Sequence, residues 1–291
     1  MEQPLMSAYK DLSGLFVRSK VMKYQNGDLS AIDKVLHKHS LTSVYQGLSY
    51  SEALKKIYQS LVINYQNEYV IKNEFLNRYL APNLAGTDSI VLNELKMGPA
   101  TVDLCFISES SCAYEIKTAL DSDARLAAQL NTYNRVFNKV SVIFPLEHYL
   151  KYKKYGDRAN LIAYSDEGRV FETIGTIKPN SAIDVDSLMV FLHTKEYMSI
   201  VSTYYEREII VNDFERFNVC KEMIRQIPFD ELNILVLDAI KSRRLQVKSR
   251  RINNFFFSKE HNELNQISLA LNLNQGAGLD LVHVLSNSFV D

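Results

Sequence analysis

The sequence predicts an α/β fold, in which helices flank a central mixed β-sheet and a mainly helical region follows. Three observations support this prediction. Apolar runs with strand-like alternation lie between residues 90 and 117, helical apolar spacing surrounds them, and no strand-like alternation follows Ile183. We therefore divide the chain into an N-terminal helical arm at 1–48, a core at 49–180 and a helical accessory region at 181–291.

Helices are expected before the sheet. The first covers residues 30–38. Ser49 and Glu52 form a capping-box pattern that begins a long helix, which must stop before Pro82. The apolar residues at helical spacing along this second helix are Leu54, Ile57, Leu61, Tyr65, Tyr69, Leu76 and Leu80.

The sheet is predicted to begin with three antiparallel strands, at residues 90–95, 102–107 and 113–117. A turn centred on Gly98 and Pro99 places Glu94 opposite Asp103, and a turn centred on Glu109 places Asp103 opposite Glu115. The three carboxylates then form one row across the sheet, and Lys117 lies two residues along the same face. A solvated sheet face would explain this row, but we favour a divalent cation among the oxygens, because opposed like charges repel.

A helix and two strands are expected next. Asp121–Asp123 is predicted to cap a helix from Ala124 to Phe137. Arg125, Gln129 and Tyr133 would form one ridge of it, either as a solvated face or as groups that reach the site. A buried strand at 140–145 and an edge strand at 161–164 complete the sheet, and strand, helix and strand in this order imply a parallel crossover.

The residues of this core resemble a known superfamily. Asp103 followed by Glu115-Ile116-Lys117 resembles the PD-(D/E)xK nucleases, although Val102 stands where the signature has proline. Gln129 and Tyr133 match the Q-x-x-x-Y motif of the RecB-like branch. Residues 50–165 are also similar to an uncharacterised bacterial family that is known by a locus-tag name.

This resemblance implies a restriction-endonuclease-like core and a cytoplasmic, metal-dependent nuclease. Asp103 and Glu115 would hold Mg²⁺ or Mn²⁺, with Glu94 or Glu68 as further ligands; Glu68 could equally form an intrahelical ion pair with Lys72. Lys117 would orient the attacking water or stabilise negative charge. Gln129 and Tyr133 would position the strand backbone, DNA is expected rather than RNA, and a homodimer remains open.

The accessory region contains a basic run between residues 241 and 251. Its six cations are Lys241, Arg243, Arg244, Lys248, Arg250 and Arg251. Together with Arg125 they could bind phosphates, or the run could be the solvated face of a helix. The following Asn253–Phe257 could add a stacking surface or belong to the core.

Bulk properties limit the choice of function. With 33 basic and 34 acidic residues, nucleic-acid binding would need a local basic patch. The three cysteines have no ligand spacing, and no apolar run is long enough to cross a membrane, so we expect a soluble protein. Two alternatives remain: a silent nuclease fold that binds nucleic acid or protein, and a metal-dependent hydrolase with another substrate.

Overall fold

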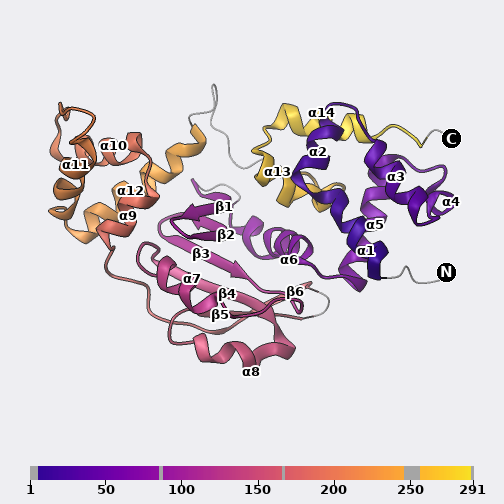
Figure 1. Cartoon of the computed structure of the whole chain (residues 1–291), viewed down its shortest axis with the longest axis horizontal. Coiled ribbons are helices and arrows are strands. Elements are labelled where there is room, and N and C mark those ends of the chain that lie inside the picture. The colour runs from indigo at the N-terminus through magenta and orange to yellow at the C-terminus, as the bar shows by residue number, and fades with distance from the viewer. Residues whose placement is uncertain (1–5, 85–87, 166–167, 246–255, 290–291) are drawn as a thin grey trace.

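The computed structural model describes residues 6–84, 88–165, 168–245 and 256–289. Helices flank a six-stranded mixed sheet whose strands follow one another in chain order, so the predicted α/β class is confirmed (Figure 1). The strands are β1 (Ile90–Met97), β2 (Ala100–Ile107), β3 (Ser111–Ile116), β4 (Lys139–Pro145), β5 (Asn160–Ser165) and β6 (Val170–Gly175).

The strand directions agree with the prediction in the first four strands. The pairs β1–β2 and β2–β3 are antiparallel, and β3 runs parallel to β4 as the crossover requires. The prediction that residues 161–164 form an edge strand is wrong, because β5 pairs with β4 on one side and with β6 on the other. Most of β6 is exposed, so it lacks the apolar alternation that marks a strand in the sequence.

The predicted register of the carboxylate row is confirmed. The pairs Asn93–Leu104 and Leu95–Val102 bracket Glu94 and Asp103, so these two residues lie opposite each other. The last pair between β2 and β3 is Leu104–Tyr114, and the next step in that register brings Asp103 opposite Glu115. Glu94 has a left-handed φ of 51°, which distorts β1 at this point.

Within residues 6–84, six α-helices precede the sheet. Their bounds are α1 (Met6–Ser13), α2 (Arg18–Gln25), α3 (Ser30–Lys38), α4 (Thr42–Tyr45), α5 (Tyr50–Asn64) and α6 (Glu68–Phe75). The helix at 30–38 and the Ser49–Glu52 capping box are confirmed. The single long helix is wrong: Asn67 begins a new helix, because its side chain accepts a hydrogen bond from the backbone N–H of Val70.

The remaining helices follow β3. They are α7 (Leu126–Tyr133), α8 (Tyr149–Tyr152), α9 (Val185–Phe191), α10 (Thr194–Tyr205), α11 (Arg216–Arg225), α12 (Phe229–Leu245), α13 (Asn265–Leu271) and α14 (Gln275–Leu285). The expected cap at Asp121–Asp123 is wrong, since Arg125 is the residue before α7 and Asp121 instead accepts hydrogen bonds from Thr118. Asn274 caps α14, and Gly276 and Gly278 lie inside this helix.

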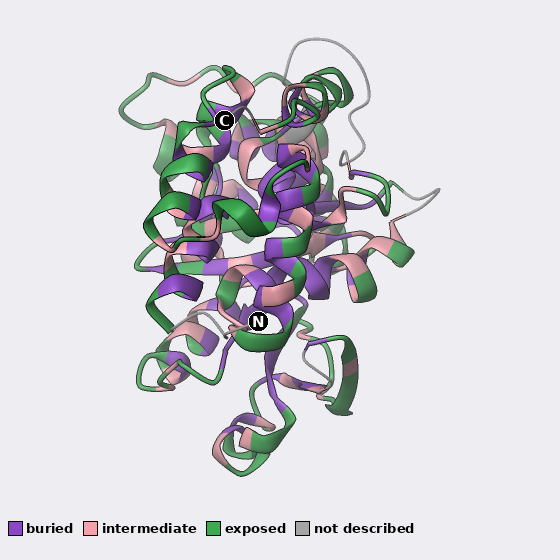
Figure 2. Ribbon diagram, turned by 90° about the vertical axis from the view of Figure 1, so that its right-hand side faces the viewer, coloured by how far each residue is buried: buried purple, intermediate pink, exposed green. Residues whose placement is uncertain are grey.

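Three groups of buried side chains hold the elements together, and buried residues run through the centre of the ribbon (purple in Figure 2). One group joins a face of the sheet to α7 and to α9–α12, and a second joins the other face to α6. The third unites the N-terminal helices with α13 and α14. The accessory region contributes to all three groups, since Leu269 of α13 also belongs to the group on the α6 face of the sheet. The proposed boundaries at 48 and 180 stay predictions.

None of the helices in the described ranges has the length and apolar character that a bilayer-spanning segment requires.

Candidate active site

Glu115 is the centre of a hydrogen-bond network at the end of β3. Its side chain is only 3% exposed. Its Oε1 lies 2.7 Å from Lys117 Nζ and accepts a second hydrogen bond of 2.7 Å from Gln129 Nε2. Its Oε2 lies 2.9 Å from the Tyr133 hydroxyl. Lys117, Gln129 and Tyr133, which the motifs singled out, thus all contact the carboxylate of Glu115.

Local structure explains why these side chains converge. The backbone N–H of Lys117 donates to the carbonyl of Ile143 on β4, which extends the parallel pairing by one residue past β3. The chain then turns and enters α7, which covers the face of the sheet that Glu115 points to. Gln129 and Tyr133 are one helical turn apart, so both reach the same carboxylate.

Tyr133 holds Glu115 and does not face solvent. Its side chain is fully buried, and its hydroxyl also lies 2.7 Å from the carbonyl oxygen of Thr101. Burial and the neighbouring Glu115 raise the pKa of this phenol far above its usual value, so it stays protonated. The expected contact of Tyr133 with a bound strand is therefore replaced by a contact with Glu115.

Asp103 lies beside this network on β2. Its Oδ2 accepts a 2.7 Å hydrogen bond from the backbone N–H of Ile116, which fixes the carboxylate next to Glu115. The pKa of Asp103 is raised to about 7, mainly by burial; Glu115 and Glu68 add to this rise, and the positive charge of Lys72 opposes it. The neighbouring acids thus favour the protonated form of Asp103, and Lys72 favours its ionised form.

Lys72 is the site residue that the sequence reasoning missed. It is 2% exposed, and its Nζ lies 2.8 Å from Glu68 Oε1, 3.6 Å from Asp103 Oδ1 and 4.0 Å from Glu94 Oε1. Burial lowers the pKa of Lys72, but the three carboxylates outweigh burial and raise it, so the ammonium remains charged. The i, i+4 spacing from Glu68 was the one signal for this residue, and the expected ion pair is present.

The donor chemistry fits a divalent cation beside Asp103 and Glu115. No three His, Cys, Asp or Glu side chains in the described ranges are arranged to hold a metal as they stand. Mg²⁺, however, commonly uses one or two protein carboxylates and completes its shell with waters and substrate phosphate. When ionised, the carboxylates of Glu68, Glu94, Asp103 and Glu115 carry two more charges than Lys72 and Lys117 balance, which is the charge of one such ion.

An opening lies next to this cluster. Glu68, Lys72 and Glu94 line one end of a cavity of about 270 Å³, and Arg18 and Ala270 line its other parts. Glu94 is 63% exposed, so solvent reaches the carboxylates from this side. A ligand in this opening would therefore meet Glu68, Lys72 and Glu94.

Three of the residues predicted to bind nucleic acid have described side chains, namely Arg125, Lys241 and Arg243. Arg125 is exposed at the start of α7. Lys241 Nζ lies 3.5 Å from Asp88 Oδ2, and Arg243 makes two hydrogen bonds, of 2.6 and 2.8 Å, to the buried Glu196. The side chain of Arg244 and all of Lys248, Arg250 and Arg251 lie outside the described residues.

These observations define a mixed α/β protein with a carboxylate and lysine cluster formed by α6, the strands β1–β3 and the residue after β3. The family model described as bacteriophage P4 protein cII matches residues 62–270, which include β1–β6 and every predicted site residue. The chain therefore belongs to the bacteriophage P4 protein cII family. No curated protein and no solved structure matches the chain.

Proposed function

We propose that the protein is a metal-dependent nuclease that hydrolyses phosphodiester bonds in nucleic acid, with DNA rather than RNA as its substrate. The observation that carries this proposal is the meeting of Lys117, Gln129 and Tyr133 at Glu115. The fold brings the parts of the PD-(D/E)xK and Q-x-x-x-Y motifs together, as a working site of that superfamily requires. The assignment to the superfamily rests on these residues alone.

The cation would be held by Asp103 and Glu115, with Glu94 or Glu68 on its open side. When bound, Mg²⁺ or Mn²⁺ would polarise the phosphate and favour ionisation of an attacking water. Gln129 and Tyr133 fix the orientation of Glu115 through their hydrogen bonds. Lys117 supplies a positive charge beside the position where negative charge grows on the phosphate oxygens.

The reaction needs no further reactant besides water. A water oxygen forms a bond to phosphorus, the bond between phosphorus and the leaving sugar oxygen breaks, and one water proton passes to that oxygen. The chain's own groups orient the phosphate and stabilise its charge. Nothing in this set of residues reads base sequence, so cleavage should depend on nucleic-acid structure.

The first experiment incubates the protein with linear, circular and single-stranded DNA and with RNA, in Mg²⁺, Mn²⁺ or EDTA. Asp103→Asn keeps an acceptor for the N–H of Ile116 but removes the charge, and Lys117→Ala removes the ammonium. Both variants should lose cleavage by at least about a hundredfold while keeping their thermal stability within a few degrees. Asp157→Ala, an exposed acid on the loop before β5, is the control. Wild-type activity in Asp103→Asn would overturn the proposal.

The position of Lys72 favours a second candidate, a nuclease-like fold that binds nucleic acid or protein without cleaving it. Because this ammonium already neutralises part of the charge of three carboxylates, the cluster can be stable with no metal. Calorimetric titration with Mn²⁺ separates the two functions. A nuclease should bind the ion and lose binding in Asp103→Asn, whereas a silent site should bind weakly and equally in both proteins.

A further inference from the structure

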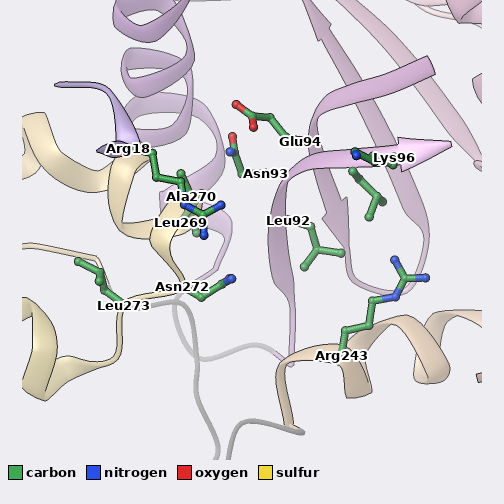
Figure 3. A pocket seen from close by; sticks show the side chains of 11 residues that line it. Arg18, Leu92, Asn93, Glu94, Lys96, Arg243, Leu269, Ala270, Asn272 and Leu273 are labelled. Carbon is green, nitrogen blue, oxygen red and sulfur yellow. The ribbon is translucent and has the colours of Figure 1, made fainter. Parts of the chain in front are cut away.

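A second, larger cavity of about 420 Å³ lies along the edge strand β1 (Figure 3). One wall is β1, from which Leu92, Glu94 and Lys96 line the space. The opposite wall is formed by Leu269 of α13 and by Arg18, the first residue of α2. Segments from both ends of the chain and from the sheet therefore enclose one hollow.

This cavity adjoins the opening at the candidate active site. Arg18, Glu94 and Ala270 line both cavities, and the smaller one ends at Glu68 and Lys72. We call the two adjoining cavities together the β1 groove. The groove leads from the space beside Lys96 to the carboxylates around Lys72.

The β1 groove is lined both by cations that form no ion pair in the described ranges and by apolar side chains. Arg18 and Lys96 are exposed, and neither forms an ion pair within the described ranges. Arg243 also lines the groove, but its guanidinium is held by Glu196 and lies 4.6 Å over the ring of Phe191. Three leucines also line the groove: Leu92 on the β1 wall, Leu269 on the opposite wall, and Leu273.

This chemistry suits an unpaired nucleic-acid strand better than a duplex. A duplex presents phosphates on its outside and keeps its bases stacked inside, so its bases could not contact the leucines. An unpaired strand can place phosphates on cations and turn its bases onto apolar side chains. A groove that is lined by leucines and by two cations without ion pairs therefore matches an unpaired strand.

We propose that the β1 groove binds single-stranded nucleic acid next to the phosphate that is cleaved. Arg18 and Lys96 bind phosphates of that strand, and the leucines that line the groove contact its unpaired bases. The inference rests on the nucleic-acid part of the proposed function and not on hydrolysis itself. Neither cation belongs to the motifs of the core, so the groove adds a substrate-binding element to them.

The test measures binding in EDTA, where no metal-dependent cleavage can occur. Fluorescence anisotropy follows a labelled oligothymidylate of twelve nucleotides and a duplex of the same length, with the full-length protein, at several salt concentrations. The double variant Arg18→Ala with Lys96→Ala should bind the single strand about tenfold less tightly at 0.1 M salt. Its log affinity should also fall less steeply with log salt, by about 1.4, because each lost single-strand phosphate contributes about 0.7.

The control is Lys34→Ala, which removes an exposed cation from α3, a helix that Figure 1 places away from β1. This variant should bind as the wild type does, and urea denaturation should show all three proteins equally folded. Equal affinity of the double variant and the wild type, or tighter binding of the duplex, overturns the inference. Single-strand binding that depends on Arg18 and Lys96 without any cleavage in Mg²⁺ supports the groove and contradicts hydrolysis. Cleavage that is unchanged by both substitutions supports hydrolysis and contradicts the groove.

Discussion

Glu263 shows at the scale of one residue how burial sets the state of an acid. It lies in the 3₁₀ turn Asn262–Leu264 before α13, is 1% exposed, and neither carboxylate oxygen has a hydrogen-bond partner among the described residues. Burial raises the pKa of this carboxyl from 4.5 to about 7, and nearby Lys55 lowers it only in part. The folded protein therefore holds a proton here that the unfolded chain releases.

The consequence for stability has a definite sign. Because the folded state binds the proton more tightly, the free energy of unfolding should fall as pH rises from about 4.5 to 7 and then level off. Glu263→Gln removes the charge at constant shape, so it should stabilise the protein by about 3 kcal/mol at pH 8 and have little effect at pH 4. Urea denaturation at both pH values measures this difference. Glu260→Gln, an exposed neighbour, should show neither effect, and an equal effect of both substitutions would contradict the prediction.

At the scale of elements, the start of α6 determines where Glu68 and Lys72 lie in the candidate active site. Asn67 caps α6 through a 3.2 Å hydrogen bond from the N–H of Val70, and Glu68 and Lys72 follow in the first turns. Asn274 caps α14 in the same way, with a 2.9 Å hydrogen bond from the N–H of Ala277. The two caps have the same chemistry, but only the first supports residues of the candidate active site.

This pair provides a matched test. Asn67→Ala and Asn274→Ala should each lower the free energy of unfolding by about 1 kcal/mol, because each leaves N–H groups of a first helical turn unsatisfied. Only Asn67→Ala should also weaken Mn²⁺ binding, since fraying of α6 displaces Glu68 and Lys72. Urea denaturation and calorimetric titration give the two readouts. If Asn274→Ala weakens Mn²⁺ binding as much, the effect reflects general loss of stability.

At the scale of the whole molecule, the helices of the C-terminal third pack in two places. The helices α9–α12 share their buried side chains with the sheet and α7, whereas α13 and α14 share theirs with the N-terminal helices. The two ends of the chain also meet in the backbone, since the N–H of Tyr50 donates a 3.0 Å hydrogen bond to the carbonyl of Asn287. In Figure 1, α13 and α14 accordingly lie beside α2 and α5.

Two core truncations should therefore act on different parts of the molecule. Leu281→Ala in α14 and Ile224→Ala in α11 each remove a fully buried side chain and should cost about 2–5 kcal/mol. Hydrogen exchange should show faster opening of α2 and α5 in the first variant and of α9 and α10 in the second. Equal loss of protection throughout the chain in both variants would mean that the cores unfold as one unit.

The sequence by itself determined the parts that depend on neighbouring residues. Alternation and short turns located β1–β4 and set the register that opposes Glu94, Asp103 and Glu115, because tight turns leave little freedom in pairing. The spacing of Gln129 and Tyr133 on one helix face brought both to Glu115. These residues are close in sequence or joined by one turn or crossover, so local rules were sufficient.

Only the tertiary structure decided which distant segments meet at the site. Lys72 reaches Glu94 and Asp103 because α6 packs on the sheet, and Arg18 lines the groove because α2 and α13 share a core with each other. The largely exposed β6 joined the sheet through its pairing with β5, without a hydrophobic pattern of its own. Such contacts depend on burying apolar surface between elements far apart in the chain, and no local spacing encodes which element will cover which.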